Sequence, residues 1–334
     1  MSCTEAVSGV DRSADSLERC KLDQCVGESA ARTPRGTKMK IVTDFRSEPP
    51  FEILAPADQR LPFVFNSPHS GTCYPQSFLD ASRLDRLTIR RSEDAFVDEL
   101  FAGVVPMGSP LLRVRFPRVY LDVNREPYEL DPKMFDGRLP PYANTRSLRV
   151  AGGLGTIARI VSESREIYAR RLTVEEGIER IETLYKPYHN TLRRLLAQTH
   201  VSFGFAVLID CHSMPSTVRC QTTGARPDFI LGDRYGTSCP MELTELAASL
   251  LKAKGYTVSR NKPYAGGFIT EHYGRPAKGL HALQIEINRG LYMDEHLHVP
   301  TEGMARLADD LMDVLRDLTC MPDAALLPLR LAAE

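Results

Sequence analysis

The sequence predicts an α/β fold, a single three-layer α/β/α domain built on a mixed, mainly parallel sheet. Short apolar runs such as AVLI at 206–209 alternate with longer segments that carry apolar residues at helical spacing. Continuous apolar runs are typical of strands that helices cover on both faces. No Pro-, Gly- or Ser-rich linker long enough to separate two domains follows Pro50.

The expected elements alternate along the chain. Apolar residues three and four positions apart predict the helices, and Pro187 predicts a kink in the longest of them. Helices are expected at 95–104, 173–197, 240–254 and near 302–318. Strands are expected at 63–66, 111–116, 119–123, 205–209, 229–231, 256–259 and 282–287.

Composition narrows the classes of function. A net charge of −1 over 334 residues gives no reason to expect nucleic acid or an anionic membrane as a partner. No apolar run approaches the roughly 20 residues of a membrane helix, and the N-terminus lacks the apolar core of a signal peptide. The eight cysteines form no CxxC pair, so we expect reduced thiols in a cytoplasmic protein. These features do not indicate an oligomeric state.

The ends of the chain differ from its middle. Residues 1–45 are polar and lack sustained periodicity, so we expect a disordered tail or an extension there. The catalytic domain is expected to cover 46–325, and residues 326–334 are expected to form a C-terminal tail.

Polar side chains follow several of the expected strands, at the edge where the sites of open α/β sheets gather. Two histidines come directly after buried runs, and a pair of acidic residues, Glu93 and Asp94, precedes the helix at 95–104. The polar residues just after strands are His69, Asn124, Arg125 and His212, and Glu286 lies within the last strand.

Two histidines and one carboxylate are the ligands of many catalytic zinc sites, where another carboxylate accepts the proton of the attacking water. His69 and His212 would supply the imidazoles. Either Glu93 or Asp94 would supply the third ligand, and Glu286 would be the base. The compact HExxH motif is absent, so an alternative stays open in which both histidines are merely hydrogen-bonded and Asp94 stabilises a helix N-terminus.

Other chemistries have less support. Cys211 precedes His212, but neighbouring strand residues project to opposite faces, so the two side chains cannot act as a pair. No GxSxG elbow, phosphate-binding loop or dinucleotide fingerprint is present. Arg125 carries a rigid fork suited to a carboxylate, although a surface ion pair with Asp122 or Glu126 also fits the sequence.

Eight segments, in order over about 62–300, resemble the N-formylglutamate amidohydrolase family. This family is related to metallocarboxypeptidases and aspartoacylase-like deacylases, which share a three-layer α/β/α fold and a zinc site. The segments are SPHSG (67–71), EDAFVDELF (93–101), FPRVYLDVNR (116–125), YKPYHNTLRR (185–194), LIDCHSM (208–214), PDFILGDRYGTSC (227–239), NKPYAGGFITEHYG (261–274) and HALQIEINRGLYM (281–293).

The resemblance implies a zinc-dependent amidohydrolase that removes a small N-acyl group, such as formyl, from an acidic amino acid such as glutamate. Another divalent metal would suit the same ligands, and the family's place is in amino-acid degradation such as histidine catabolism. The implied roles are metal ligation by His69, Asp94 and His212, general base catalysis by Glu286, carboxylate binding by Asn124 and Arg125, and assistance or carbonyl polarisation by Arg118.

Some features depart from the pattern of the family and its relatives. Thr72 replaces the glutamate of the HxxE motif, Ala95 replaces a tryptophan, and the segment 124–153 differs beside the expected substrate pocket. The reaction class is therefore better supported than the substrate. A metallocarboxypeptidase or amidase acting on peptides or cell-wall fragments is one alternative, and a non-catalytic binder of an acidic metabolite is another. Asp210, two positions before His212, is expected to orient a ligand.

Overall fold

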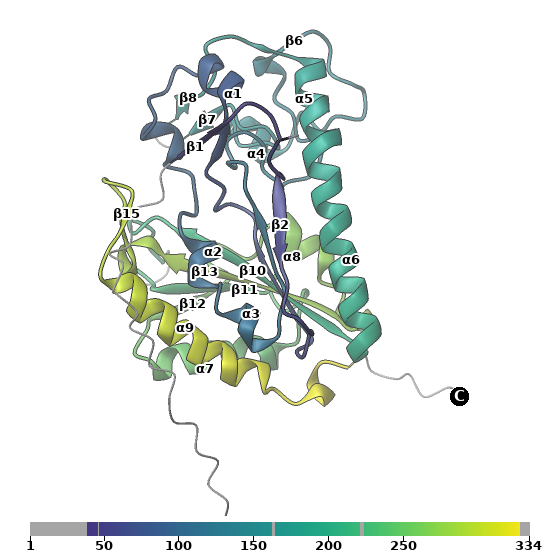
Figure 1. Cartoon of the computed structure of the whole chain (residues 1–334), viewed down its shortest axis with the longest axis vertical. Coiled ribbons are helices and arrows are strands. Elements are labelled where there is room, and N and C mark those ends of the chain that lie inside the picture. The colour runs from purple at the N-terminus through teal and green to yellow at the C-terminus, as the bar shows by residue number, and fades with distance from the viewer. Residues whose placement is uncertain (1–38, 46, 162–163, 221–223, 328–334) are drawn as a thin grey trace, which may run out of the picture. The chain divides into compact units, whose positions relative to one another are not determined.

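A seven-stranded sheet organises the computed structural model, which describes residues 39–45, 47–161, 164–220 and 224–327 (Figure 1). Among these residues, four neighbouring strand pairs of the sheet run parallel and two run antiparallel. The predicted mixed, mainly parallel sheet is therefore confirmed. In spatial order the strands are β12 (Val258–Arg260), β11 (Phe229–Gly232), β13 (Leu280–Asn288), β10 (Ala206–Met214), β3 (Phe63–Ser67), β5 (Leu111–Val114) and β2 (Phe51–Leu54).

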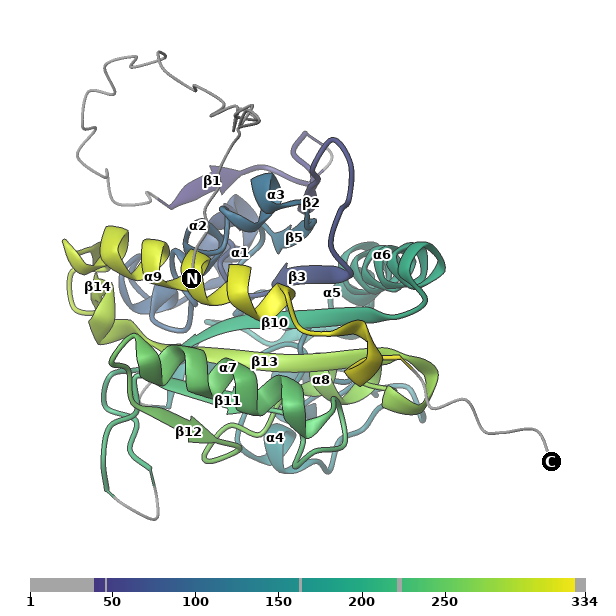
Figure 2. The same ribbon diagram turned by 90° about the horizontal axis from the view of Figure 1, so that it is seen from below.

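Helices cover both faces of the sheet, as the apolar strands predict. Val207, Ile209 and Cys211 of β10 belong to one apolar cluster, which also contains residues of α7 and α9 (Figure 2). Ala206 and Leu208 belong to a second cluster on the other face, together with residues of α6 and α8. The helices are α1 (Gln76–Ala81), α2 (Val97–Leu100), α3 (Val104–Met107), α4 (Leu148–Ala151), α5 (Val174–Arg180), α6 (Lys186–Phe203), α7 (Met241–Ala253), α8 (Phe268–Tyr273) and α9 (Gly303–Thr319).

Short two-stranded ladders lie outside the main sheet. One pairs β1 (Lys40–Val42) with β4 (Cys73–Pro75) in parallel, so regular structure begins before residue 46. Residues 1–38 and 328–334 of the two predicted tails lie outside the described residues, whereas Leu326 is buried in the first cluster. The other short elements are β6 (Phe135–Asp136) with β9 (Leu172–Thr173), β7 (Ile160–Val161) with β8 (Arg165–Glu166), β14 (Met293–Asp294) with β15 (Val299–Pro300), and the turns η1 (Thr88–Arg90), η2 (Pro132–Met134), η4 (Pro276–Lys278), η5 (Arg289–Leu291) and η6 (Asp323–Ala325).

The long helix predicted at 173–197 is present, but its winding changes near the middle. α5 runs into a π-helical turn, η3 (Ile181–Tyr185), and α6 continues from that turn. Pro187 lies in the first turn of α6. A proline has no N–H to donate, so it interrupts the regular bonding of a continuous helix. The structure shows a π-helical turn just before the proline, at the place where the sequence predicted a kink.

The strand predicted at 119–123 is wrong. These residues form an irregular loop, although Val119, Leu121 and Val123 are buried in the second apolar cluster. The alternation of apolar residues in the sequence correctly indicated that every second side chain is buried. It did not indicate a strand, because a buried loop can produce the same pattern. The remaining predicted strands are present with ends shifted by a few residues, and α7 and α9 confirm the helices at 240–254 and 302–318.

The helix predicted at 95–104 is divided into α2 and α3. Phe96 has a left-handed backbone, with φ of 64°, immediately before α2. Gly103 lies between the two helices, and a Cβ there would overlap the Met312 side chain of α9. The break lets both short helices contact α9. No helix among the described residues is long and apolar enough to cross a membrane.

His189 of α6 is a buried histidine that the fold uses in its neutral form. Its Nε2 lies 2.9 Å from the carbonyl oxygen of Val123, and its Nδ1 lies 2.9 Å from the hydroxyl of Tyr273. The carbonyl can only accept, so Nε2 carries the hydrogen and Nδ1 accepts from the hydroxyl. Burial lowers the pKa of His189 to about 3.

We predict that His189 contributes to loss of stability in acid. Between its ordinary pKa near 6.5 and its folded pKa of about 3, the unfolded chain binds a proton that the folded chain does not. The free energy of unfolding therefore falls by up to about 1.4 kcal/mol per pH unit as the pH decreases through this window. Denaturant titrations at several pH values should give a shallower slope for His189→Gln than for the unsubstituted protein. Equal slopes would contradict this assignment.

Candidate metal centre and active site

The candidate site lies on the face of the sheet where β10 and β13 run side by side in parallel. Their register pairs Asp210 with Gln284 and His212 with Glu286. Residues two positions apart on a strand share a face, so all four side chains project to the same side. His212, Gln284 and Glu286 line a cavity of about 550 Å³.

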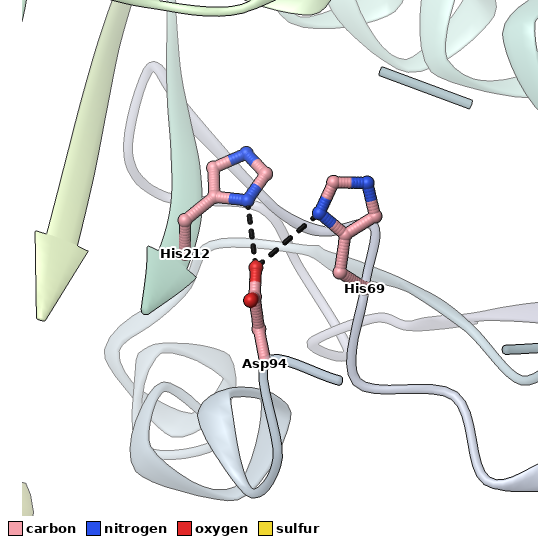
Figure 3. Close-up of side chains that lie close together, drawn as sticks. All are labelled: His69, Asp94 and His212. Atoms are coloured by element: carbon pink, nitrogen blue, oxygen red, sulfur yellow. Dashed lines mark hydrogen bonds and ion pairs between the residues drawn. The ribbon is translucent and has the colours of Figure 1, made fainter. Parts of the chain in front are cut away.

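Three of the predicted residues converge at this cavity. Asp94 Oδ2 lies 2.9 Å from His212 Nδ1 and 3.3 Å from His69 Nδ1 (Figure 3). One ligand atom from each residue lies within 4.8 Å of the others, and all three side chains are buried. Two imidazole nitrogens and one carboxylate oxygen this close together form a donor set that can hold a divalent metal ion.

The opposite nitrogen of each imidazole supports this arrangement. His69 Nε2 lies 2.8 Å from Asp122 Oδ1, and His212 Nε2 lies 3.0 Å from Asp210 Oδ2. The carboxylate beside Nε2 keeps a hydrogen on that nitrogen in each ring. Nδ1 of each ring faces Asp94 Oδ2 and donates a hydrogen to it, and a bound metal ion would take the place of these two hydrogens. Burial acts to raise the pKa of Asp94, but hydrogen bonds from both histidines hold it well below its usual value. The residues present therefore fit a metal ion.

Glu93, the alternative third ligand, is directed elsewhere. Its carboxylate accepts hydrogen bonds from Arg90 Nε at 3.0 Å, from Arg90 Nη2 at 2.9 Å and from the Tyr74 hydroxyl at 2.6 Å. His298 Nε2 lies 3.0 Å from its other oxygen. Asp94 is the member of the pair that faces the histidines.

The SPHSG segment holds His69 next to Asp94 through its backbone. Asp94 donates its N–H to the His69 carbonyl at 3.0 Å, and the Ser70 hydroxyl donates to the Asp94 carbonyl at 3.0 Å. Gly71 passes so close to the chain that a Cβ would overlap the carbonyl oxygen of Phe116. The close approach explains why a glycine ends this segment.

Glu286 lies in the cavity wall and is buried. Gln284 Nε2 donates to Glu286 Oε1 at 2.9 Å, while Gln284 Oε1 accepts from the Gly267 N–H at 2.7 Å. Burial raises the pKa of Glu286 to about 7. Gln284 was not among the predicted site residues, although its position two residues before Glu286 places it on the same face of the strand.

Asn124 lines the cavity but already has partners. Its Oδ1 accepts from the Ile269 N–H at 2.8 Å, and its Nδ2 lies 3.1 Å from His212 Nε2. With its hydrogen directed to Asp210, His212 Nε2 cannot also accept from the amide, so we interpret this second approach as a contact. Asn124 therefore links the beginning of α8 to the metal-site histidine.

Arg118 and Arg125 lie in the same wall and differ in their partners. Arg118 Nη2 is 2.9 Å from Asp122 Oδ2, and its Nη1 is 3.7 Å from Asp94 Oδ1. Arg125 donates to two backbone carbonyls, from Nε to Leu154 at 3.0 Å and from Nη1 to Asn124 at 2.9 Å. Its distance to Asp122 Oδ2 is 3.6 Å, which is too long for a hydrogen bond. The fork of Arg125 is thus fixed mainly by neutral groups.

Arg289 is a further residue of the site that was not predicted. Its Nη2 lies 3.0 Å from Asp94 Oδ1, and its Nε donates to the Ser213 hydroxyl at 3.1 Å. It therefore holds the oxygen of Asp94 that does not face the histidines. Arg289 comes directly after β13, and this position in the sequence could have indicated a place at the edge of the sheet.

The cavity is lined by more cationic than anionic side chains, with arginines at 91, 118, 125, 149, 234 and 289 and carboxylates at 94, 122 and 286.

Comparison with known proteins gives consistent matches. A curated N-formylglutamate deformylase of Pseudomonas aeruginosa strain PAO1 is 30% identical over 270 residues, which is 80% of this chain and 94% of that protein. An N-formylglutamate deformylase of Pseudomonas putida is 30% identical over 247 residues, 73% of this chain and 86% of that protein.

Solved structures agree with these matches. The crystal structure of N-formylglutamate amidohydrolase from Ralstonia eutropha JMP134 is 38% identical, with a TM-score of 0.76 over 80% of this chain and 97% of that chain. A gene product of Agrobacterium tumefaciens at 16% identity and a TM-score of 0.55 shares the fold over 84% of this chain. Residues 61–293 match the sequence model of the N-formylglutamate amidohydrolase family. The chain belongs to the N-formylglutamate amidohydrolase family.

Proposed function

We propose that this protein hydrolyses the amide of N-formylglutamate to formate and glutamate, with a zinc ion held by His69, Asp94 and His212. The observation that carries the proposal is the convergence of these three side chains in a cavity rich in arginine, beside the buried carboxylate of Glu286. Relatives at 30% and 38% identity bear the names of this activity. The two imidazole nitrogens favour zinc over magnesium or calcium, which prefer oxygen ligands.

When bound, a zinc ion supplies Lewis-acid polarisation of the formyl carbonyl and of water. The side chains of this protein do the rest of the chemistry. Asp122 and Asp210 keep the histidine hydrogens on Nε2, and Arg289 holds the far oxygen of Asp94. These contacts fix the direction of each ligand atom before any metal binds.

Glu286 is the proposed general base. Water gives up one proton as its oxygen bonds to the formyl carbon, and the carboxylate of Glu286 accepts that proton. The C–N bond then breaks, and Glu286 returns the proton to the departing amine nitrogen. A pKa of about 7 suits a group that must both accept and donate near neutral pH. Gln284 Nε2 donates a hydrogen bond to Oε1 of Glu286 and so keeps the carboxylate in place.

The arginines are proposed to handle the negative charges of the reaction. Arg118 lies 3.7 Å from Asp94 Oδ1, close enough to the metal centre to stabilise charge that develops on the carbonyl oxygen. Arg125, whose fork is fixed by backbone carbonyls, would bind a carboxylate of the amino acid. Asn124 would act indirectly, by holding the start of α8 against the site.

A second candidate function is the hydrolysis of a larger N-acyl amino acid or a short peptide. The cavity is spacious for a formyl group, and one part of its wall is apolar. The apolar side chains of this wall are Val119, Leu154, Ala158, Ile160 and Val161. Such a wall would suit an apolar acyl chain.

We propose a cytoplasmic location and a small-molecule substrate. Cys73, Cys211 and Cys239 are buried thiols outside any disulfide, which suits a reducing compartment.

His212→Ala should lose the metal. With one imidazole removed, two ligands remain, and the protein as purified should contain far less zinc than the approximately one ion per chain expected for the unsubstituted protein. Elemental analysis measures the difference. His296→Ala removes an exposed histidine and is the matched control. Full zinc content in His212→Ala would contradict the ligand assignment.

Glu286→Gln should keep zinc but lose turnover. The amide retains the shape of the side chain and cannot accept a proton, so kcat should fall by about 10²- to 10⁴-fold. Formate release and zinc content are measured on the same sample. Glu175→Gln, at an exposed position of α5, is the control. Full activity in Glu286→Gln would rule out its role as the base.

A substrate panel should separate the two candidate functions. We expect kcat/KM to be highest for N-formyl-L-glutamate and to fall for N-acetyl-L-glutamate, longer N-acyl glutamates and dipeptides ending in glutamate. Ninhydrin-reactive amine or free glutamate can be measured for every member of the panel. Faster hydrolysis of a long N-acyl chain or a dipeptide would favour the second function.

A further inference from the structure

Arg149 projects from α4 into the wall of the cavity. The Ser147 hydroxyl accepts from the Val150 N–H at 3.1 Å and begins this short helix. Just after the helix, the Leu154 N–H donates to the Arg149 carbonyl at 2.8 Å, and the Leu154 carbonyl accepts from Arg125 Nε at 3.0 Å. Leu154 thus links the main chain at Arg149 to the guanidinium of Arg125.

The segment that carries Arg149 is held firmly against Glu129. The Thr156 N–H donates to the Glu129 carbonyl at 2.9 Å, and a Cβ at Gly155 would overlap that carbonyl oxygen. Arg149 Nη1 lies 3.7 Å from Glu129 Oε2, which is beyond hydrogen-bond distance. The buried Oε2 has no hydrogen-bond partner among the described residues. Glu129 therefore attracts Arg149 without occupying its N–H groups.

The cavity arginines whose ion pairs are described fall into two groups. Arg118, Arg234 and Arg289 each have a carboxylate oxygen within 3.0 Å. The shortest described ion pairs of Arg125 and Arg149 are 3.6 and 3.7 Å. These two are the better placed to exchange a distant protein carboxylate for a carboxylate of a ligand.

Arg125 and Arg149 are also close enough to affect each other. Burial and the nearby charges of Arg118 and Arg149 lower the pKa of Arg125, against the opposing effect of Asp122. Crowding of guanidinium groups in one wall is unfavourable until an anion lies between them.

We propose that Arg149 binds the second carboxylate of the substrate while Arg125 binds the first, so that Arg149 selects dicarboxylic N-acyl amino acids over monocarboxylic ones. This inference rests on the proposed function and assigns a substrate contact to the segment 124–153. Two guanidinium groups fixed to the same short segment set the distance between the two carboxylates. A neutral side chain in the substrate would leave Arg149 facing Glu129 at its present distance.

The test compares N-formyl-L-glutamate with N-formyl-L-glutamine, which has the same shape and one carboxylate fewer. In Arg149→Gln we expect kcat/KM for N-formyl-L-glutamate to fall by about tenfold or more, chiefly through KM, because a charge-assisted contact is lost. The value for N-formyl-L-glutamine should stay within about twofold. Arg149→Lys should retain part of the preference, since a lysine keeps the charge but not the fork. Arg146→Gln, at an exposed position outside the cavity, is the matched control.

Equal losses for both substrates, or no loss for either, would overturn the inference. A wild-type protein that hydrolyses no N-formyl amino acid would instead contradict the proposed function. In that case calorimetric binding of L-glutamate still tests Arg149. Weaker binding by Arg149→Gln than by the wild type supports the inference, and equal binding overturns it.

Discussion

Two buried imidazole rings can both direct Nδ1 at Asp94 because a carboxylate lies beside each Nε2, Asp122 for His69 and Asp210 for His212. Burying carboxylates is costly unless each finds partners, so the site is built as a network and not as three isolated ligands. Arg118 and Arg289 complete it by meeting the remaining oxygens of Asp122 and Asp94. The network ties β10 and η5 to the three loops that carry His69, Asp94 and Asp122.

The parallel register of β10 and β13 decides which side chains enter this network. It sets His212 beside Glu286 and Asp210 beside Gln284, with Cys211 on the opposite face in the apolar cluster. A shift by one residue would place a thiol in the cavity and an imidazole in the apolar core. The continuous apolar burial of β10 on its other face makes that shift costly.

The sequence predicted those features that depend on local pattern. Buried apolar runs located the sheet, and the polar residues after them included His69 and His212, which the structure brings together. The strand predicted at 119–123 was wrong because a buried loop can have the same alternation of apolar residues as a strand. Arg289 meets Asp94 across 195 positions of sequence, and no local pattern records such a contact. The position of Arg289 just after β13 indicated the edge of the sheet but not its contact with Asp94.

The loop from 263 to 267 and the helix α8 that follows it are connected to the chemistry at two points. The Gly267 N–H is joined to Glu286 through Gln284, and the Ile269 N–H is joined to Asn124, which touches His212. A displacement of this stretch of chain would therefore disturb the contacts of the proposed base, Glu286, and of the metal ligand His212 at the same time. Residues 263–267 also line the cavity, so a movement of this loop that made room for a ligand would change the surroundings of Glu286 and His212 at the same time.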